Sequence, residues 1–99
     1  MENTLCVITC QYYDENGKPK FAQTFELRVD ADMFMYAPTE LIKDSLQRFI
    51  DDHWKINNYA GHCVYISHEL VFNDPHRLPT GYLEDYMTRL YDANPSLYK

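Results

Sequence analysis

Residues 5–30 have the sequence LCVITCQYY-DENGKP-KFAQTFELRVD, and this stretch decides which fold the rest of the chain can adopt. Both flanks are rich in strand-forming residues. Asn16-Gly17 between them is the strongest two-residue signal for a β-hairpin. We therefore predict a hairpin over residues 4–30, with Asn16 and Gly17 as its two loop residues.

The register of this hairpin can be checked within the sequence, because such a loop pairs positions whose numbers sum to 33. One face then carries apolar pairs, namely Cys6 with Leu27, Ile8 with Phe25 and Tyr12 with Phe21. The other face carries Leu5 with Arg28, Thr9 with Thr24 and Glu15 with Lys18. A slip of one residue would mix the two faces, so turn and alternation support the same register.

An amphipathic helix is predicted over residues 38–59, because apolar side chains recur there at helical spacing. Pro38 suits its first position, and Gly61 is a candidate left-handed residue at its end. The apolar side of this helix consists of Ile42, Leu46, Phe49, Ile50, His53 and Ile56.

A third strand is predicted over residues 62–73, followed by a loop over 73–79 and a last helix over 81–93 that Thr80 caps. One face of the strand carries Val64, Ile66, His68, Leu70 and Phe72, and the other carries Cys63, Tyr65, Ser67, Glu69 and Val71. The stretch Met33-Phe34-Met35-Tyr36 is predicted as an apolar loop that either docks on the core or binds a partner.

The predicted order is strand, strand, helix, strand, helix (ββαβα) in a single domain spanning residues 1–99. A right-handed crossover places the first strand in the centre, which gives an antiparallel sheet of order 2-1-3. Both helices are expected on the face that carries Ile8, Phe25, Leu27, Val64 and Ile66. The fold class is therefore α+β, a two-layer sandwich.

Composition narrows the classes of function. The chain has 99 residues, of which 45% are apolar and 24% charged, as expected of a globular domain rather than a disordered tail. It has no apolar run long enough to span a membrane and no secretory leader, so we expect a cytoplasmic protein with reduced cysteines. A net charge of −6 and scattered lysines and arginines argue against direct binding to nucleic acid.

No catalytic, cofactor or metal site is predicted, because the sequence has no cysteine or histidine spacing typical of one. His62 and Cys63 are adjacent on a strand, as are Ser67 and His68, so the members of each pair point to opposite faces. We therefore expect no enzymatic activity. An enzyme or ligand-binding domain with a pocket near His53, His68 and Cys63 remains a third alternative.

His53 and His68 each interrupt an apolar stripe. They are either two separately satisfied histidines at the edge of the core, or a buried pair that resists protonation. A buried pair would destabilise the fold below about pH 6.

The charged helix faces are the remaining candidates for function. The alternative is that Asp44–Arg48 and Asp51–Lys55 pairs make them ordinary solvated surface. Opposite the apolar side of the first helix, an acidic ridge consists of Glu40, Asp44, Gln47 and Asp51. Helical spacing places Trp54 between the two, and aromatic residues beside charge are typical of interfaces. The predicted partner-binding residues are Glu40, Asp44, Asp51, Asp52, Trp54, Glu84, Asp85, Tyr91 and Asp92.

Carboxylates about 6 Å apart on a helix can present negative charge to a groove that normally holds phosphates. We therefore expect a non-enzymatic acidic binding or inhibitor protein that imitates nucleic acid and docks on a basic surface of a partner protein. Immunity proteins and phage anti-defence inhibitors share this size and charge, which is an analogy and not a motif match. The alternative is a homodimeric interaction module or regulatory subunit that uses the outer sheet face, where Leu5, Val7, Tyr65 and Val71 are predicted to be uncovered.

Overall fold

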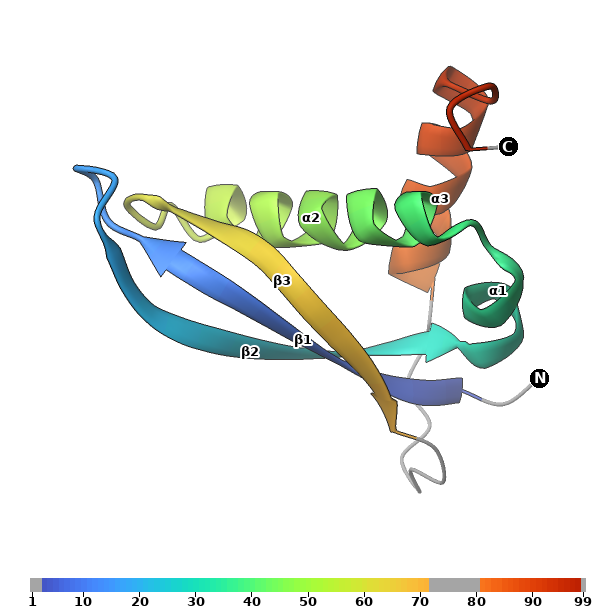
Figure 1. Ribbon diagram of the computed structural model, residues 1–99, viewed down its shortest axis with the longest axis horizontal. Coiled ribbons are helices and arrows are strands. Elements are labelled where there is room, and N and C mark those ends of the chain that lie inside the picture. Colours follow the sequence, from blue (N-terminus) through green and yellow to red (C-terminus); the bar gives the residue numbers. More distant parts are fainter. Residues whose placement is uncertain (1–2, 72–80, 99) are drawn as a thin grey trace.

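The three strands form one antiparallel sheet, and helices α2 and α3 lie on the same side of it (Figure 1). The computed structural model describes residues 3–71 and 81–98. Its strand order is β2-β1-β3, which confirms the predicted α+β architecture and the central position of the first strand. The elements in chain order are β1 (Asn3–Tyr13), β2 (Pro19–Asp30), α1 (Ala31–Tyr36), α2 (Thr39–Ile56), β3 (His62–Val71) and α3 (Gly81–Ala93).

The predicted register of the hairpin is confirmed over most of its length. Strands β1 and β2 pair Leu5 with Arg28, Cys6 with Leu27, Ile8 with Phe25 and Thr9 with Thr24. Alternate residues of β1 therefore point toward the helices, and the inward positions Cys6, Ile8 and Cys10 are fully buried. The alternation of side chains and the turn thus act together, as expected where one face of a strand pair is buried.

The hairpin turn differs from the predicted two-residue loop. The Asp14 amide donates to the Lys18 carbonyl oxygen at 3.0 Å, so residues 15–17 form a three-residue loop in which Gly17 has a φ of +78°. The carboxylate of Asp14 also accepts hydrogen bonds from the Asn16 and Lys18 amides, both at 2.9 Å. Asp14, and not Glu15, closes the turn, because a left-handed glycine at the third loop position is a favoured hairpin geometry.

This additional loop residue changes the pairing next to the turn. A register shift between Gln11 and Tyr13 replaces the predicted pairing of Tyr12 with Phe21. The two rings still lie side by side, with centroids 5.5 Å apart.

The pairing of β3 with β1 contains a bulge that the sequence pattern did not predict. Thr9 pairs with Ser67, but the next residue, Cys10, pairs with Tyr65, so Ile66 is an extra residue on β3. An extra residue reverses the inward and outward alternation on the two sides of a bulge. Strand β3 therefore cannot present one continuous set of alternate residues to the core.

The prediction that Val64 and Ile66 face the core is wrong for this reason. Cys63 is buried and Tyr65 packs against the core, whereas Val64 and Ile66 are exposed, Ile66 by 54%. Beyond the bulge the predicted phase holds, because His68 pairs with Ile8 and is half-buried. Tyr65, which was predicted on the outer face, therefore lies on the helix side of the sheet.

The stretch predicted as an apolar loop is the short helix α1. Phe34 is buried in the core, which confirms docking, but Met35 and Tyr36 are 65% and 85% exposed. Ring contact between Phe34 and His68, with centroids 5.2 Å apart, joins α1 to β3. One side of α1 thus belongs to the core and the other side is open.

Helix α2 is shorter than predicted. Pro38 is its N-cap, and Asn57 ends it by bonding through its amide to the His53 carbonyl oxygen. Asn58, with a φ of +55°, is the left-handed residue that follows, so the prediction that Gly61 caps the helix is wrong. Ile56 is exposed as a consequence of this early end.

Gly61, which directly precedes β3, is required there for a different reason. It has a φ of +73°, and a Cβ atom there would lie 2.1 Å from the carbonyl oxygen of Tyr13. Its backbone therefore passes the end of β1 at a distance that only glycine allows.

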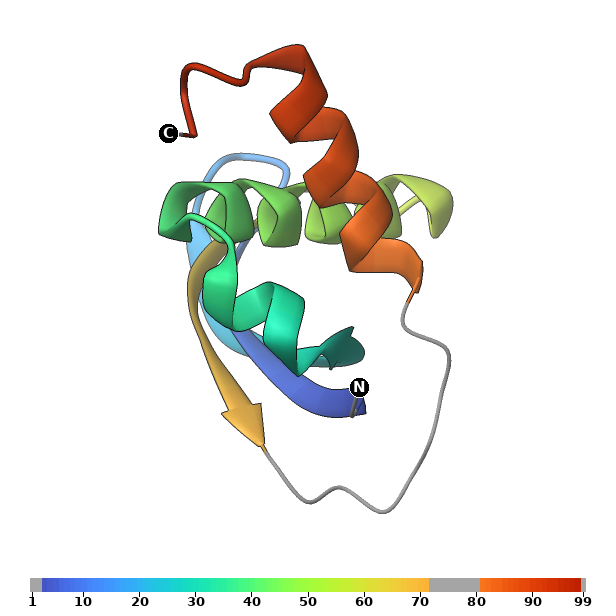
Figure 2. The same ribbon diagram turned by 90° about the vertical axis from the view of Figure 1, so that its right-hand side faces the viewer.

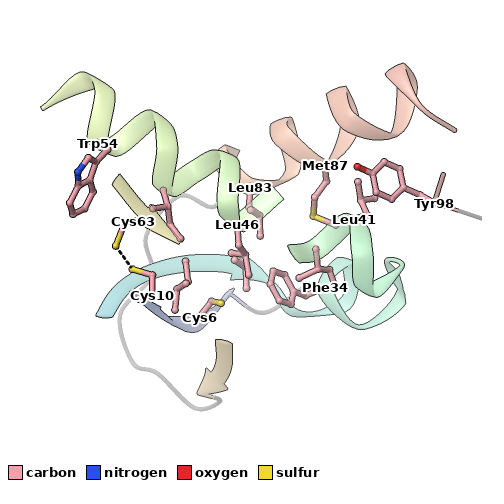
Figure 3. Close-up of a cluster of buried hydrophobic side chains, with 14 residues drawn as sticks. Cys6, Cys10, Phe34, Leu41, Leu46, Trp54, Cys63, Leu83, Met87 and Tyr98 are labelled. Atoms are coloured by element: carbon pink, nitrogen blue, oxygen red, sulfur yellow. Dashed lines mark hydrogen bonds between the residues drawn. The ribbon is translucent and has the colours of Figure 1, made fainter. Parts of the chain in front are cut away.

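The core lies between the sheet and α2, and it extends toward α3 (Figure 3). Helix α3 begins and ends as predicted and packs mainly across α2 rather than directly on the sheet (Figure 2). The predicted loop over 73–79 and the Thr80 cap lie outside the described residues. The core side chains include Ile8, Val29, Phe34, Leu41, Leu46, Ile50, Leu83, Met87 and Tyr98.

Candidate functional site

Three of the predicted partner-binding acids on α2 are hydrogen-bonded to uncharged groups. The Tyr98 hydroxyl donates to Asp44 at 2.7 Å, and the Tyr86 hydroxyl donates to Asp52. The side-chain amide of Gln47 donates to Asp51 at 3.0 Å. These bonds orient the carboxylates without cancelling their charge.

The expected neutralising pairs are replaced by these contacts. Over the described ranges, Asp44 and Asp51 do not form the predicted pairs with Arg48 and Lys55, and Glu40 is the α2 acid that has a lysine within 4 Å, at 3.6 Å from Lys43. Arg89 of α3 stacks over the Tyr86 ring at 5.2 Å. Among the described residues, no lysine or arginine forms an ion pair with Asp44, Asp51 or Asp52.

Asp44 and Asp51 also border a common hollow between α2 and α3. Its volume is about 280 Å³, and Tyr98 lies at its edge. The hydrogen bond to Asp44 raises the pKa of Tyr98 to about 12, because ionising the phenol would place two negative charges side by side. The hollow is lined by Asp44, Gln47, Arg48, Asp51, Leu90, Asn94 and Tyr98.

The predicted residues of α3 do not all join this hollow. Asp85 and Asp92 are exposed, and the Glu84 side chain lies outside what the structure describes. Tyr91 and Asp92 line a second depression, which they share with α1 and the start of α2. Asp44 and Asp51 therefore line the first hollow and Tyr91 and Asp92 line the second. Of the predicted residues whose side chains are described, those that line neither of them are Glu40, Asp52, Trp54 and Asp85.

Trp54 belongs to the core, so its predicted place on an exposed flank is wrong. Only 8% of the residue is exposed, and the indole N–H donates to the Ala60 carbonyl oxygen at 3.1 Å. Its ring packs against Tyr12 and Tyr59, with centroids 5.6 and 5.0 Å away. The chain after α2 folds back over the indole, which helical spacing alone does not reveal.

The second depression is an apolar groove. It measures about 590 Å³, and its wall is almost wholly apolar although three aspartates are among the residues that line it. Its lining consists of Asp30, Asp32, Tyr36, Ala37, Pro38, Leu41, Met87, Thr88, Tyr91 and Asp92. We call it the α1–α3 groove. The Met-Phe-Met-Tyr stretch was a signal for it, but which of those side chains point outward depends on α1 being a helix.

The thiols are arranged differently from the sequence expectation, which placed Cys63 on the outer face of the third strand. Cys63 donates to Cys10 with their sulfur atoms 3.0 Å apart, and both residues are buried (Figure 3). Burial raises the pKa of Cys10 to about 12, and it raises the pKa of Cys63 as well. Protonated buried thiols are poor nucleophiles, so this pair does not favour covalent catalysis.

His53 and His68 lie in separate clusters. The His53 ring contacts Phe25 and Tyr59, whereas Nδ1 of His68 lies 2.7 Å from the Tyr65 hydroxyl. Burial lowers the pKa of His68. The structure therefore favours two separate edge histidines over a buried pair.

In residues 3–71 and 81–98, no three His, Cys, Asp or Glu side chains come together in a way that would hold a metal ion. No helix within the same ranges combines the length and apolar character needed to cross a bilayer.

No protein-family model, curated protein or solved structure matches this chain. The geometry and the charge of the protein are therefore the evidence for its role.

Proposed function

We propose that this chain is a non-enzymatic binding protein whose acidic α2–α3 side docks on a basic surface of another protein and blocks or steers it. The single observation that carries the proposal is the bonding of Asp44, Asp51 and Asp52 to uncharged donors instead of to lysine or arginine. A ridge of carboxylates that remains charged and is held in place is suited to a cationic surface.

The proposed target surface is one that normally holds nucleic acid. Glu40 and Asp44 lie one helical turn apart, at roughly 6 Å, and Asp51 lies two turns beyond Asp44, so negative charges recur along α2 as they do along a nucleic-acid strand. The net charge of −6 adds long-range attraction toward such a surface. The protein would then act as an inhibitor by occupying the phosphate groove, as an anti-defence or immunity-type protein does.

The test begins with affinity capture from cells of the source organism, and the captured partner is then purified for binding measurements. We expect a nucleic-acid-handling protein whose affinity falls steeply between about 50 and about 500 mM salt, because exposed charges are screened over that range. Asp51→Lys and Asp85→Lys should each weaken binding, because both residues are exposed on the proposed surface.

Glu15→Lys is the matched control. It makes the same change of charge at an exposed residue of the hairpin turn, at the far end of the sheet from α3 (Figure 1). Affinity that is indifferent to salt, or that falls equally in all three variants, would contradict docking through the α2–α3 side.

Exposed apolar residues on the outer sheet face favour a second candidate, a homodimeric module. Val64, Ile66 and Val71 are exposed there, and Val7 is half-buried between them. This candidate predicts a dimer in light scattering that Ile66→Asp dissociates and Asp51→Lys leaves intact. Tyr65, which was predicted to be part of this face, lies on the helix side of the sheet and does not contribute to it.

The proposal places the protein in the cytoplasm. Cys6, Cys10 and Cys63 are all free thiols and are all buried. Free cysteines are typical of a reducing compartment, which supports this placement.

A further inference from the structure

The α1–α3 groove exposes apolar side chains that folding leaves without a partner. In the six-residue helix α1, Phe34 is buried, whereas Tyr36, which lines the groove, is largely exposed. Tyr91 on the opposite wall is 41% exposed. Leu41 and Met87, both buried, form the apolar floor between them. An apolar depression with exposed aromatic walls is typical of a site that receives an apolar side chain.

The charge around the groove is of one sign. Asp32 lies on the α1 side, and Asp92 lies on the α3 side. Asp30 also lines the groove, but its carboxylate accepts a hydrogen bond from the Asp32 amide at 3.0 Å, so Asp32 and Asp92 are the acids that face an occupant. No lysine or arginine is among the described residues that line the groove. An occupant must therefore combine an apolar anchor with positive charge beside it.

We propose that the α1–α3 groove binds a short segment of the partner protein in which apolar side chains lie beside lysine or arginine. This inference rests on the proposed function, because it assigns the groove to the same basic partner that faces the α2–α3 acids. The volume of about 590 Å³ suits one or two anchor side chains of an amphipathic helix rather than a folded surface. The groove supplies apolar contact, and the acidic ridge supplies attraction over a longer range.

Charge argues against the other occupants. A second copy of this chain carries a net charge of −6 and would bring further carboxylates toward Asp32 and Asp92. Anionic ligands and phosphates are repelled for the same reason. A segment that combines apolar and basic side chains matches both the apolar wall of the groove and the aspartates beside it.

The experiment uses ¹⁵N-labelled full-length protein and three synthetic peptides of about 12 residues, or some three helical turns. The first has leucine and tryptophan on one helical face and lysine on the other. The second keeps the lysines and replaces the apolar residues with serine. The third keeps the apolar residues and replaces lysine with glutamate. Amide chemical shifts report where each peptide binds, and titration reports how tightly.

We expect the first peptide to shift the amides of Tyr36, Tyr91 and Asp92, and the third to shift none of them. Tyr36→Ala and Tyr91→Ala should each weaken the first peptide about tenfold, the usual cost of truncating an anchoring aromatic residue. Asp92→Lys should weaken the first peptide and allow the third to bind. Tyr36 is so exposed that its truncation leaves the fold intact, which circular dichroism checks.

Phe21→Ala is the matched control, because Phe21 is an exposed aromatic residue outside the groove. The proposal is overturned if the first peptide shifts only residues around Asp44 and Asp51, if Tyr36→Ala binds it normally, or if the third peptide binds as tightly as the first. Shifts of the same amides that grow with protein concentration, without peptide, would instead assign the groove to a second copy.

Failure of the groove and failure of the proposed function are distinguishable. Asp51→Lys should weaken salt-sensitive docking on the whole partner but change the affinity of the first peptide less than about twofold, since the residue lies outside the groove. If the groove binds no peptide and Asp51→Lys still weakens docking, the inference fails and the proposed function stands.

Discussion

The two strand pairings of this sheet share β1 but are specified in different ways. The β1–β2 ladder joins neighbours in sequence, and its alternation of side chains predicts the register from Leu5 to Gln11, which a register shift beside the turn reconciles with the longer loop. Strand β3 follows α2 in the chain, and the β1–β3 ladder contains the extra residue Ile66. Local sequence signals specify the register of the first ladder, whereas the register of the second depends on which side chains of β3 pack against α2.

The largest expected effect compares one isoleucine from each ladder. Ile8→Ala should lower the free energy of unfolding by about 3 kcal/mol, because it empties a fully buried site. Ile66→Ala should cost less than about 1 kcal/mol, because the side chain is mostly exposed. Urea unfolding measures both. Equal losses would mean that Ile66 lies in the core and that the bulge is absent.

The two left-handed glycines test the connections that lead into each ladder. Gly61→Ala should destabilise the fold by about 2 kcal/mol or more, because the new Cβ meets the Tyr13 carbonyl oxygen as well as an unfavourable φ. Gly17→Ala has a similar φ but nothing within 4 Å, so about 1 kcal/mol is expected. Thermal unfolding of both variants measures the two losses of stability. Their difference gives the cost of the close approach, because the strain from the positive φ is common to both. A smaller loss at Gly61 than at Gly17 would contradict that close approach.

The smallest effect concerns His68, which faces Ile8 across the β1–β3 ladder. Burial lowers its pKa from the ordinary value of 6.5, so the unfolded chain takes up the proton more readily than the folded protein does. The contribution of His68 to stability is therefore complete above about pH 6.5 and is lost as the pH falls through that value toward the lower folded pKa.

Urea unfolding between pH 7 and 5 measures this loss, with His68→Gln as the variant that removes it. The wild-type curve should fall more steeply with decreasing pH than the curve of the variant. Parallel curves would show that His68 is not buried as the structure has it.

The candidate site was predictable only in part. Helical spacing located Asp44, Asp51 and Asp52 on α2, because a helix brings residues three and four apart to the same side. Their partners Tyr86 and Tyr98 come from distant parts of the chain, so no local pattern indicates that they hold these carboxylates.

Two further features of the site could not be predicted without the tertiary structure. Trp54 was misplaced because the chain after α2 folds back over its ring. The α1–α3 groove was missed because its walls belong to three helices that meet only in the folded protein. In both cases the important contacts join different segments of the chain. Helical periodicity describes the faces of one helix and does not predict how such segments are placed relative to each other.

The sequence by itself determined the class of fold, the strand order, the hairpin register and the extent of α3. Each of these follows from period-2 or period-3.6 alternation and from local turn residues, which act within a few positions along the chain. Tertiary structure decided the phase of β3, the burial of Trp54, the contact between Cys10 and Cys63 and the division of the acidic surface into two hollows. These depend on close packing between distant segments, where a single extra residue such as Ile66 changes which side chains are inside.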